Sequence, residues 1–172
     1  MARSNCLAAY KCHNIKDISK AAQLIGHIHE EMELHISYCH SYGISEEEIH
    51  TTTEDIVCMA YSRFILDIGQ SSDFLALQVA MAPCFFGYSE IANWLINDPN
   101  TKRQGNNYTK WIDNYVDESY TNSVRARRDL LESKALYVGP NRIEELVDIF
   151  TRATRMEKEL WTISLNASRA LG

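Results

Sequence analysis

The chain has 172 residues, of which 45% are hydrophobic and 23% are charged. This balance is ordinary for a globular protein and excludes long disordered segments. At this length about two thirds of the unfolded surface is buried on folding, so we expect one domain, residues 1–172, with its own hydrophobic core. The net charge of -6 argues against a surface that binds nucleic acid or an anionic membrane.

The five cysteines are an odd number without paired spacing, and no hydrophobic run near the N-terminus is typical of a secretory signal. Reduced thiols and a cytoplasmic location are therefore expected. No run approaches the roughly 20 apolar residues that span a bilayer, so no membrane partner is expected. A basic cluster, Arg125, Arg127 and Arg128, is interpreted as the solvated face of a helix.

Long helices should dominate, because the chain has only 7 glycines and 3 prolines and no segment alternates like a strand. Ser45 and Glu48 have the spacing of a capping box, and Gly69 is suited to end the helix that they begin. The helices expected in this part of the chain cover residues 1–11, run from Ile15 to Tyr42, and run from Ser45 to Ile68.

The second half of the chain predicts four more helices and one polar loop. Ser72 can cap the first of these helices, and the turn-rich residues 97–107 are interpreted as a surface loop. Pro140 is well suited to the first turn of the last helix. The expected helices run from Ser72 to Ile96, over residues 109–115, from Ser119 to Leu136 and from Asn141 to Asn166. The chain is therefore expected to be all-α.

The helix from Ser72 to Ile96 carries the best candidate site, because Pro83, Cys84 and Tyr88 meet in it. Proline has no backbone N–H and its ring crowds the carbonyl four residues before it, so the helix should bend there. Cys84 and Tyr88 share one face, and Gly87 beside them leaves room for a ring or another helix to approach. A buried cysteine in a bent core helix is the plainer alternative.

The histidine-rich segment from His27 to His40 does not match a metal site. A zinc protease motif needs His-Glu-x-x-His, and Glu33 stands where the second histidine should be. A di-iron bundle needs two Glu-x-x-His pairs, and only Glu47 and His50 have that spacing. A polar helix face explains these residues as well, so no metal and no cofactor is expected.

Two further residues stand out by their neighbours. Tyr61 lies among aliphatic residues, where a core tyrosine with a bonded hydroxyl is the ordinary interpretation. Glu157 precedes Trp161 by four residues, so the carboxylate and the indole share a helix face. An apolar surrounding favours the neutral form of a carboxyl group, which is the usual route to a general acid near neutral pH.

Five segments together resemble the TenA family, the haem-oxygenase-like all-helical proteins of thiamin salvage. They are EMELH from Glu31, AYSRF around Tyr61, APCFFGYSEI around Cys84, YTKWIDNY from Tyr108 and the Glu-x-x-x-Trp pair at Glu157. Their order and spacing cover nearly the whole chain, which is most similar to the cysteine-containing branch that includes domains at the ends of fungal pyrimidine kinases. The resemblance implies a haem-oxygenase-like helical bundle that assembles as a homotetramer.

Members of this family cleave the exocyclic substituent from a 4-amino-2-methylpyrimidine, releasing ammonia from the aminomethyl compound or thiazole from thiamin. By motif, the resemblance implies that Cys84 is the nucleophile that adds to the electron-poor ring and that Glu157 moves the proton. It implies that Tyr61, Tyr88 and Tyr115 bind this small-molecule substrate in an aromatic slot. No lysine or arginine lies within one helical turn of Cys84 to favour its thiolate.

The chain departs from the family pattern at its N-terminus, where it begins at what resembles the middle of a family helix. The family's first helices are missing, and with them an aspartate that binds the aminopyrimidine; the first aspartate of this chain is Asp17. Three alternatives stay open. Met1 is an internal methionine of a longer hydrolase, the shortened chain folds with weak or no turnover, or the chain is a catalytically silent relative that regulates or forms oligomers.

Overall fold

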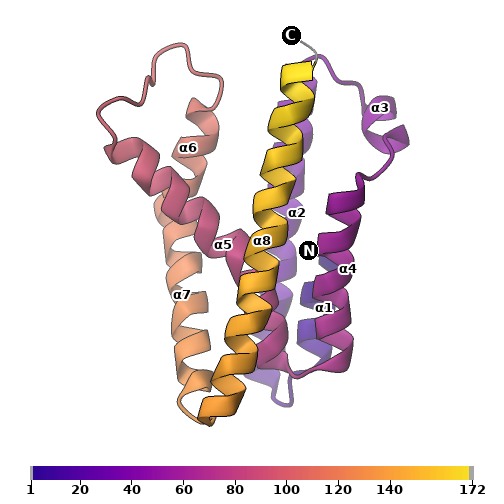
Figure 1. Ribbon diagram of the computed structural model, residues 1–172, viewed down its shortest axis with the longest axis vertical. Helices are drawn as coiled ribbons and strands as arrows, with labels where there is room; N and C mark the ends of the chain where they lie inside the picture. The colour runs from indigo at the N-terminus through magenta and orange to yellow at the C-terminus, as the bar shows by residue number, and fades with distance from the viewer. Residues whose placement is uncertain (1, 171–172) are drawn as a thin grey trace. The chain divides into compact units, whose positions relative to one another are not determined.

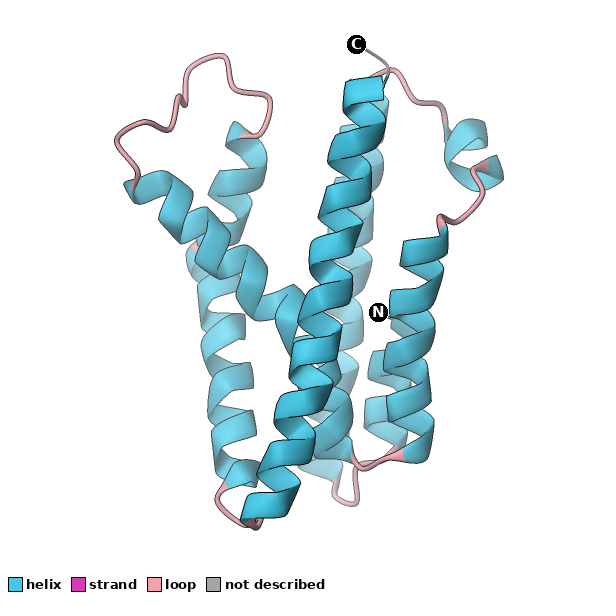
Figure 2. Ribbon diagram, viewed as in Figure 1, coloured by secondary structure: helices cyan, strands magenta, loops and turns pink. Residues whose placement is uncertain are grey.

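Every regular element in residues 2–170 is a helix, as Figure 2 shows, so the all-α fold class is confirmed. The computed structural model describes this range, except for the side chains of Ala2, Lys20, Leu24, His27, Glu30 and residues 167–170. The helices are α1 (Ala2–Tyr10), α2 (Ile15–Ser41), α3 (Glu46–Thr51), α4 (Ile56–Ser71), α5 (Phe74–Asn97), α6 (Thr109–Val116), α7 (Glu118–Ala135) and α8 (Pro140–Ala170).

These helices form two compact units (Figure 1). The first unit holds α1 to α4 and the start of α5, up to Leu77, together with the described residues of α8 from Lys158 on. The second unit is Gln78–Glu157, which contains most of α5, all of α6 and α7, and the first part of α8. The expectation of one domain stays a prediction.

In the first unit, α1 packs against both α2 and α4. A Cβ atom at Gly69 would lie 2.7 Å from Cδ2 of Leu7, so the glycine allows this close approach of α1 to α4. Lys11 Nζ donates a hydrogen bond to the carbonyl of Ser72 at 2.7 Å, which ties the end of α1 to the end of α4. The prediction that Gly69 ends its helix is wrong, because α4 continues to Ser71.

The predicted helix from Ser45 to Ile68 is two helices. Its capping box is confirmed, since Ser45 accepts from the N–H of Glu48 and Glu48 accepts from the N–H of Ser45. The helix then stops, because Thr52 has an extended conformation in a run of β-branched threonines. Asp55 starts α4 by accepting a hydrogen bond from the N–H of Val57 at 2.8 Å.

The helix boundaries in the second half of the chain agree with the predictions more closely. Asp73 rather than Ser72 caps α5, because its Oδ1 accepts from the N–H of Ala76 at 2.8 Å. Pro83 lies inside α5 as predicted, whereas the bend expected there stays a prediction. The residues between α5 and α6 form the predicted polar loop, in which Gly105 has a φ of +73.

One helix, α5, meets the length and hydropathy criteria for a membrane span. A helix that meets these criteria was not expected from the sequence. Of its most apolar window, 56% is buried inside the protein, and the core helices of soluble proteins pass the same criteria. The finding is therefore weak evidence for a membrane segment.

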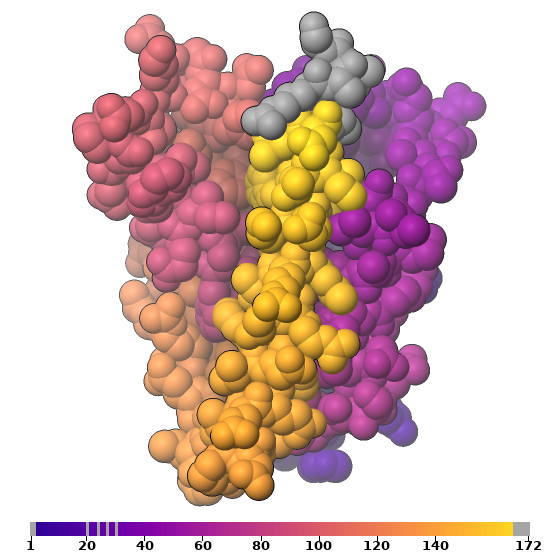
Figure 3. Space-filling model, viewed as in Figure 1, coloured from indigo at the N-terminus to yellow at the C-terminus, as the bar shows by residue number. Residues whose placement is uncertain are grey.

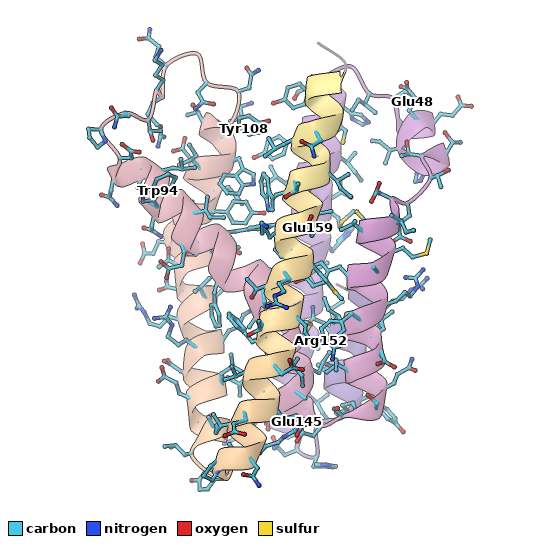
Figure 4. All side chains as sticks on the ribbon, in the orientation of Figure 1. Glu48, Trp94, Tyr108, Glu145, Arg152 and Glu159 are labelled. Carbon is cyan, nitrogen blue, oxygen red and sulfur yellow. The ribbon has the colours of Figure 1, made fainter. Side chains whose placement is uncertain are left out.

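The second unit is built around α6, whose Ile112 and Tyr115 are each 1% exposed. α8 contributes buried residues to the same unit, including Ile149 and Ala153. Another face of α8 is open to solvent (Figure 3) and carries exposed charged side chains such as Arg152 (Figure 4), which pairs with Asp148 at 3.7 Å, beside exposed apolar residues such as Val147. This amphipathic pattern fixes which side of α8 faces the interior, and Glu157 lies on the interior side.

Candidate active site

A short hydrogen bond joins α5 to α8 in the second unit. The hydroxyl of Tyr88 donates to Oε1 of Glu157 at 2.7 Å. Glu157 is only 8% exposed, and no group in the described part of the chain donates to its other oxygen, Oε2. A buried carboxylate oxygen without a donor is costly, so Oε2 is well placed to bind a polar hydrogen of a ligand or of water.

Tyr88 holds its proton firmly in this position. Burial raises the pKa of Tyr88 well above its usual range, and the negative charges of Glu157 and Cys84 raise it further. The hydroxyl therefore stays protonated at physiological pH and donates to the carboxylate. Tyr88 therefore engages Oε1 of Glu157, whereas Oε2 has no donor among the described residues.

Cys84 lies one helical turn before Tyr88 on α5 and is half-buried. None of the five cysteines, all of which have described side chains, forms a disulfide. A thiolate at Cys84 would raise the pKa of Tyr88, which lies four residues on along the same helix. The second unit thus brings together a thiol, a phenol and a buried carboxylate that sequence analysis had selected as Cys84, Tyr88 and Glu157.

A cluster of aromatic rings continues from Tyr88. The ring of Tyr115 lies 5.1 Å from that of Tyr88, and the ring of Trp111 lies 4.7 Å from that of Tyr115. Trp111 also contacts Tyr88 at 5.9 Å, and Tyr120 of α7 packs edge-on against Tyr115 at 4.7 Å. Ring pairs of this kind contribute about 0.5–1.5 kcal/mol each beyond the area that they bury. The cluster is therefore a group of packed aromatic rings beside the carboxylate, with Tyr115 buried at its centre.

A cation–π contact joins α7 to Phe85 of α5, the residue that follows Cys84. The guanidinium carbon of Arg127 lies 3.3 Å from the ring centre of Phe85, and Arg127 is only 9% exposed. The prediction that Arg127 belongs to a solvated helix face is therefore wrong, because this side chain points into the unit. Arg125 and Arg128 are exposed, as predicted.

Three residues that contact this cluster or Phe85 were not predicted from the sequence: Trp111, Arg127 and Tyr120. Trp111 stands four residues before Tyr115, so helical spacing alone indicated that the two share a face. Arg127 stands three residues after the buried Val124, a spacing that also places it on an interior face. For Tyr120 no signal was available, because its contact with Tyr115 depends on how α6 turns into α7.

Other predicted residues have plainer surroundings. Tyr61 lies in α4 of the first unit and is 7% exposed, and its part in the site stays a prediction. A Cβ atom at Gly87 would meet nothing within 4 Å beyond its own helix and its chain neighbours, so the space there is open and the approach of a ring or helix stays a prediction. No three described His, Cys, Asp or Glu side chains are close enough to hold a metal ion. Two members of the histidine-rich segment, His27 and Glu30, lie outside the described side chains.

Chemically, the arrangement combines a thiol, a buried carboxylate and a group of aromatic rings in one unit. A model of the TENA/THI-4/PQQC family matches residues 1–167. The chain belongs to this family. The resemblance read from the sequence motifs is therefore confirmed.

Curated relatives of this TenA-family chain include proteins named for pyrimidine chemistry. A protein provisionally named hydroxymethylpyrimidine/phosphomethylpyrimidine kinase 2, from Schizosaccharomyces pombe, is 43% identical over 93% of this chain. The match spans only 29% of that longer relative. An aminopyrimidine aminohydrolase from Halalkalibacterium halodurans is 26% identical over 96% of this chain and 74% of the relative.

Solved structures agree with this assignment. A TenA family transcription regulator from Silicibacter is 32% identical to the chain, with a TM-score of 0.86 over 95% of this chain and 74% of the other. A TenA homologue from Pyrococcus horikoshii has a TM-score of 0.80 at 22% identity, which shows a common fold. The all-helical fold of the family is thus the fold of this chain.

Proposed function

We propose that this TenA-family protein is a hydrolase of thiamin salvage that cleaves the exocyclic C–N bond of an aminopyrimidine. The observation that carries the proposal is the buried Glu157, which is held by Tyr88 through one oxygen and offers the other beside an aromatic surface. A carboxylate in this setting can pass a proton to a leaving nitrogen and take one from water. Family membership and the aminohydrolase named among the relatives support the same chemistry.

The proposed substrate is 4-amino-5-aminomethyl-2-methylpyrimidine or thiamin. Its flat ring is electron-poor and suits packing against Tyr88 and Tyr115, whose rings are fixed by Trp111. Tyr61 is proposed as a further substrate-binding residue. The site needs no cofactor in this reaction, because the nucleophile and the proton carrier are both side chains.

The proposed reaction has two steps. The sulfur of Cys84 adds to the pyrimidine ring and forms a C–S bond, and the exocyclic C–N bond then breaks. With the aminomethyl compound Glu157 protonates the amine, which leaves as ammonia; with thiamin the positively charged thiazolium takes the electron pair of the C–N bond and leaves as neutral thiazole without a proton. In the second step water attacks the exocyclic carbon, Glu157 takes its proton, and the C–S bond breaks to restore the ring. The net reaction of the aminomethyl compound consumes one water and yields ammonia and the hydroxymethylpyrimidine.

A catalytically silent member of the family is the competing proposal. It is favoured by the surroundings of Asp17, the first aspartate of the chain, because its Oδ2 accepts a hydrogen bond at 2.8 Å from Asn14, the N-cap of α2. Asp17 is thereby engaged in capping a helix. Such a relative would keep the fold for regulation or assembly; a cytoplasmic homotetramer is our proposal in either case.

The test is to incubate the purified chain with 4-amino-5-aminomethyl-2-methylpyrimidine and, separately, with thiamin, and to measure ammonia, thiazole and hydroxymethylpyrimidine. We expect hydroxymethylpyrimidine together with equal amounts of ammonia or thiazole. A folded protein that forms neither product under conditions where the Halalkalibacterium halodurans aminopyrimidine aminohydrolase is active would favour the silent relative.

A further inference from the structure

Arg127 occupies an unusual place for a charged side chain. It lies on α7, a helix with several exposed charged residues, yet it is 9% exposed and its guanidinium stacks on the ring of Phe85 at 3.3 Å. Phe85 itself is 9% exposed. A desolvated guanidinium over an aromatic face is held much more strongly than the same pair at the surface. The ring that follows Cys84 in the chain is therefore fixed from α7.

The backbone of the same residue is held from α7 as well. The hydroxyl of Tyr120 donates to the carbonyl oxygen of Phe85 at 3.2 Å, across 35 positions of the chain. The ring of Tyr120 also packs on Tyr115, which contacts Tyr88. Two side chains of α7 therefore contact Phe85 of α5. Arg127 contacts its ring, and Tyr120 donates to its carbonyl oxygen.

These contacts reach α5 at a turn that lacks one of its own hydrogen bonds. Pro83 has no N–H, so the carbonyl of Val79 cannot receive the usual helical bond from residue 83. Cys84 comes next in the chain, in a turn that lacks one of its own hydrogen bonds. A nucleophile in such a turn needs support from outside the helix, since a displacement of about 1 Å can cost about 100-fold in rate.

We propose that Arg127 and Tyr120 are positioning residues that hold the turn of α5 at Phe85 and so fix the thiol of Cys84 for attack. Neither side chain is placed against the substrate. The inference rests on the proposed function for its kinetic test, but the position and access of the Cys84 thiol can be measured without turnover.

The variants are Arg127→Met, Arg127→Lys and Tyr120→Phe. Methionine removes the charge and the planar group but keeps much of the length. Lysine keeps the charge, yet a compact ammonium does not stack as a guanidinium does. Phenylalanine at 120 keeps the ring contact with Tyr115 and removes only the hydrogen bond to Phe85. Tyr120→Phe also keeps the test decisive if Arg127→Met fails to fold.

The neighbouring residue supplies a matched control, Arg128→Met. Arg128 also lies on α7 over a phenylalanine, Phe86, but at 5.6 Å from the ring centre. Its side chain is 56% exposed, and it pairs with Glu90 at 3.8 Å in solvent. Its removal deletes the same atoms without touching Phe85, so we expect kcat and the reactivity of Cys84 within about twofold of the wild type.

Two measurements are needed, kcat and KM for ammonia release, and the rate at which iodoacetamide alkylates Cys84, followed by peptide mass spectrometry. For Arg127→Met we expect kcat to fall by about 10- to 100-fold with KM nearly unchanged, and alkylation of Cys84 to become several times faster as the turn loosens. Arg127→Lys should recover part of the loss. Tyr120→Phe should shift both quantities in the same direction by a smaller factor.

A merely structural role would lower the melting temperature of the Arg127 and Tyr120 variants but leave kcat and Cys84 alkylation equal to those of Arg128→Met. That result would overturn the inference. If the wild-type chain shows no turnover, the proposed function fails, and the alkylation rates alone decide the inference: faster alkylation in folded Tyr120→Phe and Arg127 variants supports it, and equal rates reject it.

Discussion

Two regions of the molecule are rich in reactive side chains, and they differ in where those side chains come from. In the histidine-rich segment of α2, the described histidine and glutamate side chains are exposed or half-buried along one helix. The ion pair of His35 with Glu31 in this segment has a distance of 3.8 Å, and the two side chains are 44% and 35% exposed. The site of the second unit instead collects Cys84, Tyr88 and Glu157 from two helices.

The difference shows what makes a group of reactive residues a candidate for catalysis. Water screens an exposed ion pair such as that of His35 with Glu31. In the second unit, burial and neighbouring charges raise the pKa of Tyr88. One oxygen of the buried Glu157 also has no donor among the described residues. Convergence from separate helices, rather than abundance in the sequence, distinguishes the second region.

The largest effect is expected from Cys84→Ser. Oxygen replaces sulfur with little change in size, so helicity measured by circular dichroism should be unchanged. The alcohol is a far weaker nucleophile, and turnover should fall by about 10⁴-fold or more. Ammonia release with the folded variant checks this, and wild-type activity in Cys84→Ser would remove the nucleophile from the proposal.

Glu157→Gln is expected to have the next largest effect. The amide keeps an oxygen that can accept from Tyr88, so the fold should survive, but it cannot carry a proton. We expect kcat to fall by about 10²- to 10⁴-fold and the pH profile of kcat to flatten. A bell-shaped profile identical to that of the wild type would mean that another residue moves the proton.

Tyr88→Phe should change how stability depends on pH. The pKa of Tyr88 is raised in the folded state, so above about pH 10 the unfolded chain releases a proton that the folded chain keeps. The free energy of unfolding should therefore fall by about 1.4 kcal/mol per pH unit above pH 10, and below that pH Tyr88 should contribute no slope.

Urea unfolding of the wild type and of Tyr88→Phe between pH 8 and pH 11 isolates this contribution, because the remaining tyrosines are common to both. The wild type should lose stability more steeply than the variant above pH 10. Parallel curves would show that the phenol is not buried against Glu157.

The smallest effect is expected from His35→Gln in α2. The lost contact with Glu31 is exposed, so the free energy of unfolding should change by less than about 0.5 kcal/mol, and kcat should stay within about twofold. Thermal unfolding and ammonia release check both values. A large loss of activity would show that the histidine-rich segment has a function that its exposure does not suggest.

Much of the fold could be predicted from the sequence because its helices carry local signals. Ser45 and Pro140 mark helix starts that the structure confirms within one residue. The break at Thr52 was missed because Ile49 and Ile56, seven residues apart, fit one continuous helix, and the preference of β-branched residues for extended backbone is weak in isolation. Gly69 was misread because the need for a small residue there comes from Leu7, far away in the chain.

The candidate site, like the fold, could be predicted only in part. Family motifs led to Cys84, Tyr88, Tyr115 and Glu157, and the second unit holds all four. Their hydrogen bonds and ring distances could not be predicted, because they depend on how α5, α6 and α8 pack. Arg127 was assigned to solvent because a charged residue on a polar helix is usually exposed, and only its contact with Phe85 shows otherwise.

The most direct test of the central claim is protection of Cys84 by substrate. Iodoacetamide would be added with and without saturating 4-amino-5-aminomethyl-2-methylpyrimidine, and the alkylation rates of Cys84 and of Cys39 in α2 would be compared by peptide mass spectrometry. We predict that the pyrimidine slows alkylation of Cys84 and leaves that of Cys39 unchanged. Equal rates at Cys84 with and without the pyrimidine would contradict the claim that this cluster binds it.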